Sequence, residues 1–378
     1  MLRGFSKVID QAASMVPAVL WSGDAMRAMK AVVARFPEVK AKTIGPVRLG
    51  IIGLELRLAP DAGQVDLCFP ILREDRDVVV ALAADETDGA WLREDPTWSG
   101  IARFCSHWAD PASLAGQYVD LLWFELDVDG EERGGIPVPG VCIALKPEAT
   151  KRLDPDGWCR LLDEVVEPLT GAPAHEATSA HFRHAMESVP PEAVVRFFGL
   201  MLSRGAGPVR FLMGDVPEKE MPSFLRTIGW PGEADALAAG FAELRTREGR
   251  LVRPGLNSIQ YDVYAGRVLP RLGLECTLDR DGQTENGIRE LEFLDALVER
   301  GLCGAEKRDA LLCLPGETVE PHDGICLLGH ARQVHHVKLV ADPEGLREAK
   351  AYYGRALAVR PLPGTAPRPA GAPVHAAV

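Results

Sequence analysis

The feature that most constrains the fold of this chain is a pair of alternating apolar and polar runs, joined by a short turn, that occurs five times. Each pair has the two-residue alternation of β-strands and the turn residues of a β-hairpin. The paired runs are 47–58 and 64–71, 120–128 and 136–145, 194–202 and 208–216, 258–266 and 269–278, and 323–329 and 334–341. The sequence therefore predicts ten strands arranged as five consecutive antiparallel hairpins.

Helical patterns separate most of these hairpins. The clearest covers 154–169, where Asp154 can cap a run with apolar residues at three- and four-residue spacing. The other expected helices are 23–36, 218–230, 231–244, 286–302 and 342–357. Residues 73–118 have the least regular pattern. In this prediction 334–341 is the tenth strand, and the segment after it is the last covering helix.

Ten antiparallel strands can bury their apolar faces in few ways. A flat sheet would leave long open edges, which proteins avoid. Closing the sheet removes the edges, and helices around the outside cover its apolar face. The polar face must then line the interior. The sequence therefore predicts an α/β fold of five repeats, in which a ten-stranded antiparallel β-barrel with a solvated lumen is surrounded by a ring of helices.

Composition and net charge limit the partners and the cellular compartment that are expected for such a barrel. The net charge of −12 and the lack of a Lys/Arg-rich tract argue against nucleic-acid or anionic-membrane partners. No run approaches the ~18 apolar residues that a membrane span needs. The eight cysteines are scattered without a CxxC pair, which favours reduced thiols in the cytoplasm. We expect one domain over 1–360, a disordered Pro/Ala-rich tail over 361–378, and a monomer or homodimer.

Alternation along each strand predicts which polar side chains line the lumen. In the first strand Leu54, Leu56 and Leu58 share one side, and Glu55 and Arg57 share the other. The same count places further residues on the polar side: Asp66, Trp123, Glu125, Asp127, Lys146, Arg210, Gln260, Asp262, Tyr264, Arg271, Glu275, Thr277, His336 and Lys338. In an open sheet these side chains would instead face solvent or form ordinary cross-strand salt bridges.

Five hairpins with helices between them, closing into a ten-stranded barrel with a polar lumen, resemble the ABBA, or PT-barrel, prenyltransferases over about residues 20–358. The resemblance rests on this repeat architecture and not on a signature motif. It implies a prenyltransferase reaction in the lumen, in which an allylic diphosphate ionises and an acceptor attacks the carbocation. The implied partners are an allylic diphosphate donor and an aromatic small molecule or ribosomal precursor peptide, whose acceptor group is aromatic, a guanidine or a peptide side chain.

The resemblance also suggests roles for individual lumen residues. Glu55 best matches the glutamate on an early barrel strand that hydrogen-bonds the acceptor and takes its proton in indole prenyltransferases. Glu125 and Glu275 are the alternative catalytic carboxylates. The leaving diphosphate needs fixed cations as its charge develops. The candidate cations are Arg57, Lys146, Arg210, Arg271 and Lys338. The other candidate substrate-binding residues are the aromatic Trp123, Tyr261 and Tyr264 and the polar His336 and Asp262.

Two features depart from that family. The indole enzymes use a collar of several tyrosines, whereas this whole chain has five, and its expected lumen is rich in carboxylates. One interpretation is that Mg²⁺, held by Asp66 or Asp127, binds the diphosphate as in some bacterial members; otherwise no cofactor is required. The other is that the barrel receives a cationic group. The protein would then be another peptide-modifying enzyme, or a non-catalytic binder of a cationic peptide or small molecule.

A histidine pair, His335–His336, offers a competing interpretation. Together with the following apolar run it resembles the opening unit of vicinal-oxygen-chelate metalloenzymes. That class needs ligands repeated from equivalent strands, whereas here the pair occurs once and no strand is expected to follow the last helix. We therefore expect His336 and Lys338 to be lumen groups, and His335 to share the outward side with Val337 and Leu339.

Overall fold

The computed structural model describes residues 9–10, 13–35, 52–73, 75–87, 89–128, 137–204, 207–247, 250–251, 256–277, 286–322 and 326–361. The beginning of the first expected strand, 47–51, and the Pro/Ala-rich tail beyond Pro361 lie outside the described residues. In the described part of the chain, none of the helices has the length and apolar character needed to cross a bilayer.

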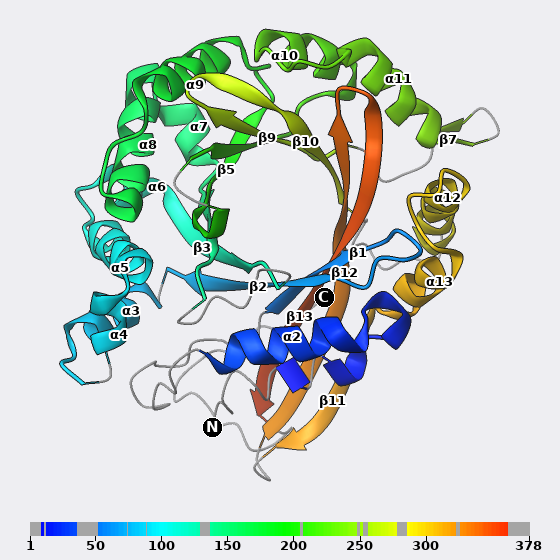
Figure 1. Ribbon diagram of the computed structural model, residues 1–378, viewed down its shortest axis with the longest axis horizontal. Helices are drawn as coiled ribbons and strands as arrows, with labels where there is room; N and C mark the ends of the chain where they lie inside the picture. Colours follow the sequence, from blue (N-terminus) through cyan, green and yellow to red (C-terminus); the bar gives the residue numbers. More distant parts are fainter. Residues whose placement is uncertain are drawn as a thin grey trace, which may run out of the picture.

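Ten antiparallel strands close into a barrel (Figure 1). The ring closes because β12 pairs with β10 on one side and with β13 on the other, and β13 pairs with β1. The strands in order around the barrel are β1 (Ile52–Arg57), β2 (Val65–Leu72), β3 (Val119–Leu126), β4 (Gly140–Leu145), β5 (Val194–Met201), β6 (Val209–Gly214), β9 (Ser258–Tyr264), β10 (Arg267–Thr277), β12 (Cys326–Asp342) and β13 (Gly345–Pro361). The predicted ten-stranded antiparallel barrel, the PT-barrel architecture, is confirmed.

Helices run around the outside of the barrel (Figure 1). They are α2 (Gly23–Ala34), α3 (Arg76–Ala84), α4 (Ala90–Glu94), α5 (Pro96–Ala109), α6 (Leu114–Tyr118), α7 (Glu148–Arg152), α8 (Pro155–Thr170), α9 (Glu176–Ser188), α10 (Met221–Thr227), α11 (Ala234–Leu244), α12 (Asn286–Glu299) and α13 (Ala305–Cys313). Short 3₁₀ turns also occur at η1 (Ala18–Leu20), η2 (Leu202–Arg204) and η3 (Glu218–Glu220), and a small hairpin pairs β7 (Thr246–Arg247) with β8 (Arg250–Leu251). Residues 73–118, which have the least regular pattern, contain α3 to α6, and α7, α9 and α13 are additions to the expected helices.

Helix α8 shows how the sequence sets the covering layer. The Asp154 carboxylate accepts a hydrogen bond from Gly157 N at 2.6 Å, so it caps the helix N-terminus as predicted. The apolar face of α8 places Trp158 edge-on against Phe198 of β5, with ring centroids 6.0 Å apart, and against Phe182 of α9 at 5.8 Å. The helix layer is therefore joined to the outer face of the barrel by aromatic packing.

The two faces of each strand separate as alternation predicts. Leu54 and Leu56 of β1 are fully buried in the same apolar core as the helix residues, whereas Glu55 between them faces the interior. Interior side chains are not fully sealed from solvent, because those of Arg57 and Arg210 remain 19% and 12% exposed. The barrel therefore has an apolar outer face under the helices and a solvated polar interior.

The C-terminal hairpin differs from the prediction. Residues 326–342 form the single strand β12, with no turn at 330–333, and 345–361 form the strand β13 in place of the expected helix. The turn lies just before Gly345, whose φ of +120° favours glycine. Strand β13 pairs along both edges, with β1 and with β12, and this tertiary pairing overrides the helix propensity of its Ala- and Arg-rich sequence. The strand that closes the barrel onto β1 is thus β13.

Strands β12 and β13 are longer than the other barrel strands and project beyond the barrel (Figure 1). Their ends pair with each other and with β11 (Gly316–His322), which lies beside the first half of β12. This three-stranded extension and β11 itself were not expected from the sequence.

Trp158→Ala should destabilise the fold by about 3–5 kcal/mol, because it leaves a large cavity between α8, α9 and β5. Urea unfolding monitored by circular dichroism measures the free energy of unfolding. Val319→Ala, at a side chain that is 58% exposed, is the control and should change it by less than about 0.5 kcal/mol. An equally small loss for Trp158→Ala would contradict the described packing.

Candidate functional site

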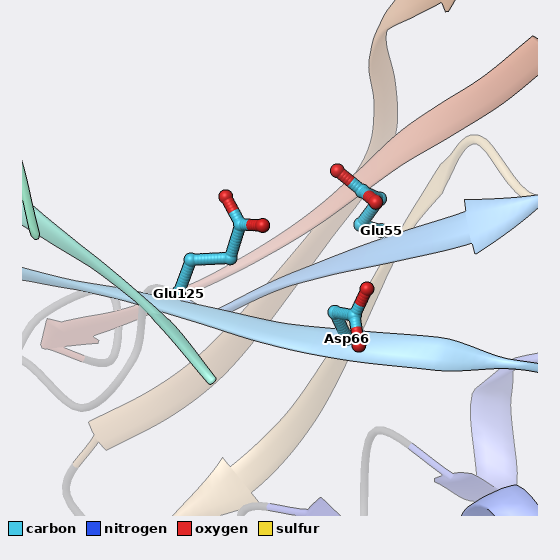
Figure 2. Close-up of side chains that lie close together, drawn as sticks. All are labelled: Glu55, Asp66 and Glu125. Carbon is cyan, nitrogen blue, oxygen red and sulfur yellow. The ribbon is translucent and has the colours of Figure 1, made fainter. Parts of the chain in front are cut away.

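Three carboxylates from neighbouring strands meet inside the barrel (Figure 2). Glu55 of β1 lies directly opposite Asp66 of β2, and Glu125 of β3 lies opposite Cys68, two residues further along β2. One oxygen from each carboxylate lies within 4.8 Å of the others. Among the described residues this is the one group of acidic, histidine or cysteine side chains with metal-ligand spacing. We call Glu55, Asp66 and Glu125 the carboxylate cluster.

Glu55 is held as an anion by the last strand of the barrel. Its Oε1 accepts a hydrogen bond from Lys350 Nζ at 2.5 Å, and its Oε2 accepts one from the Tyr352 hydroxyl. Burial of Glu55, which is 1% exposed, favours the neutral acid, but the charges of Lys350 and Lys338 and the two hydrogen bonds outweigh it and lower the pKa to about 2. Glu55 therefore carries a fixed negative charge at neutral pH.

The pKa values of the other two members of the cluster, Asp66 and Glu125, are shifted in the opposite direction. Burial and the negative charge of Glu55 raise the pKa of Asp66 to about 7, although the Val128 N–H and Arg57 partly oppose this shift. Burial and the same charge also raise the pKa of Glu125. Three carboxylates this close cannot all be ionised without added positive charge. The cluster is therefore suited to take up a proton or a metal ion.

The interior cations lie on several strands, and each has a partner in the described part of the chain. Arg57 Nη1 donates to Glu348 at 2.6 Å. Arg210 donates to both carboxylate oxygens of Asp262, at 2.8 and 3.1 Å. Lys338 Nζ donates to Gln260 Oε1 at 2.8 Å and to the Tyr352 hydroxyl at 3.1 Å. The interior thus combines these cations with the carboxylate cluster, as the lumen prediction requires.

His336 lies beside this network, and its neighbour His335 departs from the prediction. The His336 ring stacks on Tyr352, with centroids 4.2 Å apart, and burial together with the charge of Lys338 lowers its pKa to about 3. The β12–β13 pairing is irregular between Val334 and His336, so His335 lies at a β-bulge. Its Nδ1 lies 2.8 Å from Nδ1 of His336. The simple outward placement expected for His335 is therefore wrong.

Several predicted site residues lie elsewhere. Lys146 follows the far end of β4, about 20 Å along the strand from Gly140, which pairs with Glu125. Its Nζ donates to Gln117 O, so it does not join the other interior cations. Tyr264 is 55% exposed at the β9–β10 turn, and Tyr261 packs outward against Phe211.

The remaining candidates lie at or near the interior with different partners. The Arg271 side chain is 64% exposed and pairs with Glu348, which places it at the rim. Asp127 accepts a hydrogen bond from Ser203 and is not part of the carboxylate cluster. Trp123 is half-buried on the same side of β3 as Glu125. Glu275 of β10 faces the interior, and burial raises its pKa despite the nearby charge of Lys338.

The interior residues that sequence reasoning missed come mainly from β13. Glu348, Lys350 and Tyr352 alternate with the buried Ala349, Ala351 and Tyr353, which is the period of a strand. That alternation is visible in the sequence, but it coincides with residues that favour a helix. It was the one signal that could have identified Lys350 and Tyr352.

Comparison with known proteins yields similarity in three dimensions only. No family model and no curated protein matches the chain. The structure is similar to that of apo prenyltransferase PriB, at 16% identity, 93% coverage of this chain, 94% of that chain and a TM-score of 0.46. It is similar to AnaPT from Neosartorya fischeri at 13% identity, 94% and 91% coverage and a TM-score of 0.47. It is also similar to a PriB ternary complex with L-tryptophan and dimethylallyl thiolodiphosphate, at 14% identity, 93% and 94% coverage and a TM-score of 0.44. At these values the fold assignment rests on the strand pairing of the chain itself.

The raised pKa of Asp66 predicts a pH dependence of stability. Because it lies at about 7, above the ordinary 3.8, the folded protein binds a proton that the unfolded chain does not, and stability falls as pH rises through this window. Asp66→Asn should therefore reduce the loss of unfolding free energy between about pH 5 and about pH 8 by about 1–3 kcal/mol. Urea unfolding at both pH values measures this. Asp61→Asn, at an exposed residue, should retain the wild-type loss; an unchanged loss in Asp66→Asn would refute the assignment.

Proposed function

We propose that this protein transfers an allylic prenyl group from a diphosphate donor to a nucleophilic acceptor bound inside the barrel. The observation that carries the proposal is Glu55, a buried carboxylate held ionised by Lys350 and Tyr352 in the interior of a closed, polar barrel. A fixed anion at this depth can orient an acceptor N–H or O–H and stabilise positive charge that develops during transfer. Within PT-barrel proteins, that is the combination that prenyl transfer requires.

The interior side chains supply each part of the reaction. The allylic carbon–oxygen bond breaks, and the diphosphate leaves with the electron pair while Lys338, Arg57 and Arg210 face its growing charge. The acceptor's electron pair forms the new bond to carbon, and the acceptor loses a proton. The low pKa of Glu55 suits it to orienting the acceptor, whereas the raised pKa values of Asp66 and Glu125 suit that pair to receiving the proton.

Aromatic faces are needed where the allylic cation forms. Tyr352 is the first candidate, because its ring stacks on His336, lies 5.5 Å from Lys338 Nζ, and carries the hydroxyl that contacts Glu55. Trp123, on the same side of β3 as Glu125, is the second aromatic candidate. Tyr261 and Tyr264 have no part in this proposal, since one packs outward and the other is exposed.

The carboxylate cluster also fits Mg²⁺, which prefers oxygen ligands. Glu55, Asp66 and Glu125 would hold the ion, and Asp127 would not contribute. When bound, the ion would supply positive charge for the diphosphate. Without it, a proton on Asp66 or Glu125 relieves the repulsion within the cluster.

A second candidate function follows from the charge pairing. In the described interior Arg57, Arg210 and Lys350 already form ion pairs with carboxylates, which lowers their availability for a diphosphate. This favours a cationic guest over an anionic one. The barrel would then bind a cationic peptide or small molecule, either for another modification or without catalysis.

Lys338→Met should weaken binding of dimethylallyl diphosphate by about ten- to a hundredfold, because one charge-assisted contact is worth about 1.5–3 kcal/mol. Thermal shift of the wild-type protein, with and without Mg²⁺, should show stabilisation by the diphosphate. Lys219→Met, at a side chain that is 82% exposed, is the matched control. No stabilisation by dimethylallyl or geranyl diphosphate under either condition would overturn prenyl transfer, and stabilisation by a basic peptide alone would support the second function.

Glu55→Gln should lower kcat/KM for prenyl transfer by ~10²–10³-fold, because the amide cannot provide the fixed negative charge. Product formation by mass spectrometry, with a panel of aromatic and guanidine acceptors, measures the loss. Glu187→Gln, at an exposed side chain of α9, should retain full activity. Full activity of Glu55→Gln would show that its charge has no role in the reaction.

A further inference from the structure

Three polar side chains on adjacent strands β9, β10 and β12 lie close together, and among the described residues each has at least one polar atom without a hydrogen-bond partner. Ser258 is 1% exposed, and its Oγ is buried without a partner. The Nε2 atom of His336 is likewise buried and unpartnered. Ser258 lies directly opposite Glu275, and His336 Nε2 lies 3.9 Å from Glu275 Oε1, which is too long for a hydrogen bond. Ser258 on β9 and His336 on β12 therefore lie on either side of Glu275.

Glu275 is the acidic member of this group, and no described residue forms an ion pair with it that is shorter than the contact with His336. Lys338 lies opposite Glu275 in the β10–β12 pairing, but its ammonium donates to Gln260 and Tyr352 instead. No described residue donates a hydrogen bond to the Glu275 carboxylate. Burial accordingly raises its pKa. A buried hydroxyl and a buried imidazole nitrogen without partners, beside a carboxylate that is only 13% exposed, are costly, and such groups require a ligand or ordered water.

The charge of the surrounding interior indicates the kind of ligand. In the described barrel, carboxylates outnumber cations. The carboxylates are Glu55, Asp66, Glu125, Asp127, Asp262, Glu275 and Glu348, and the cations at or near the interior are Arg57, Arg196, Arg210, Arg271, Lys338 and Lys350. Anionic and neutral groups would leave the Glu275 charge unpaired, whereas a cation with several N–H donors satisfies all three acceptors at once.

We propose that Ser258, Glu275 and His336 form a subsite that binds a cationic nitrogen of the acceptor, an ammonium or a guanidinium. The cation donates to the Glu275 carboxylate, to Ser258 Oγ and to His336 Nε2. The neutral His336 can present Nε2 as an acceptor when its Nδ1 donates to His335. This inference rests on the proposed function, and it names the substrate class of that same interior.

The subsite would also orient the rest of the acceptor. His336 stacks on Tyr352, and the Tyr352 hydroxyl donates to Glu55. An acceptor anchored at Glu275 by its cationic nitrogen can extend along the Tyr352 ring toward Glu55 and the carboxylate cluster. The cationic nitrogen is then a recognition group, and a second group of the same molecule is the nucleophile.

Binding of matched cationic and neutral probes tests the subsite without any prenyl donor. Isothermal titration calorimetry would compare tryptamine with tryptophol, and Nα-acetyl-arginine amide with Nα-acetyl-citrulline amide. These pairs separate an ammonium from a guanidinium preference. In at least one pair the wild-type protein should bind the cation about tenfold more tightly than its neutral analogue.

Variants locate this preference. Glu275→Gln should reduce the affinity ratio of the cation over its neutral analogue to about twofold or less. Ser258→Ala should weaken binding of the cation by about two- to tenfold. Glu317→Gln, at an exposed residue of β11, should leave the preference unchanged. Melting temperatures of all variants establish that they are folded.

The outcomes separate this inference from the proposed function. A cation preference that disappears in Glu275→Gln supports the subsite even if no allylic diphosphate binds, which would then overturn prenyl transfer alone. Wild-type protein that binds neither cation, shows no preference, or keeps the preference in Glu275→Gln overturns the subsite, even if the diphosphate stabilises the protein.

Discussion

The contact between Glu55 and Lys350 joins the first and last strands of the barrel, and the electrostatics of the interior follow from it. A carboxylate that is 1% exposed stays ionised only when it is paired and hydrogen-bonded, and β13 supplies both Lys350 and Tyr352. The charge fixed on Glu55 then raises the pKa of Asp66 and Glu125. The same strand pairing that closes the barrel therefore sets which interior carboxylate is a permanent anion and which can accept a proton.

The side on which each strand residue lies could be predicted, because the two-residue period of a strand fixes it. Glu55, Asp66 and Glu125 were placed in the lumen on this basis, and they meet there. Lys350 and Tyr352 were missed for a physical reason. Residues 342–357 are rich in helix formers, and only pairing with β1 and β12, which are remote in sequence, makes this segment a strand.

The alternation of residues along a strand does not show how far along the barrel axis a side chain lies. It also does not show where a strand is interrupted by a bulge or a turn. Lys146 has the predicted parity, yet it lies beyond the opposite end of β4 from Gly140 and Glu125, because depth depends on register between strands. His335 leaves the outward side because a bulge inserts it between two regular pairs. Tyr264 has the expected parity as well, but it ends its strand at a turn and is exposed. Register, bulges and strand ends come from tertiary contacts that a single sequence does not display.

The charge balance of the interior connects the two proposals. An allylic diphosphate brings negative charge into a barrel whose carboxylates already outnumber its cations, so its binding is opposed unless positive charge enters with it. Mg²⁺ at the carboxylate cluster is one source, and a cationic acceptor at Glu275 is another. Either would favour donor binding electrostatically, and by linkage the donor would favour the cation equally. Donor and acceptor binding are then coupled through charge, because the cationic acceptor suits the acidic interior by itself and, once bound, lowers the electrostatic cost of admitting the diphosphate.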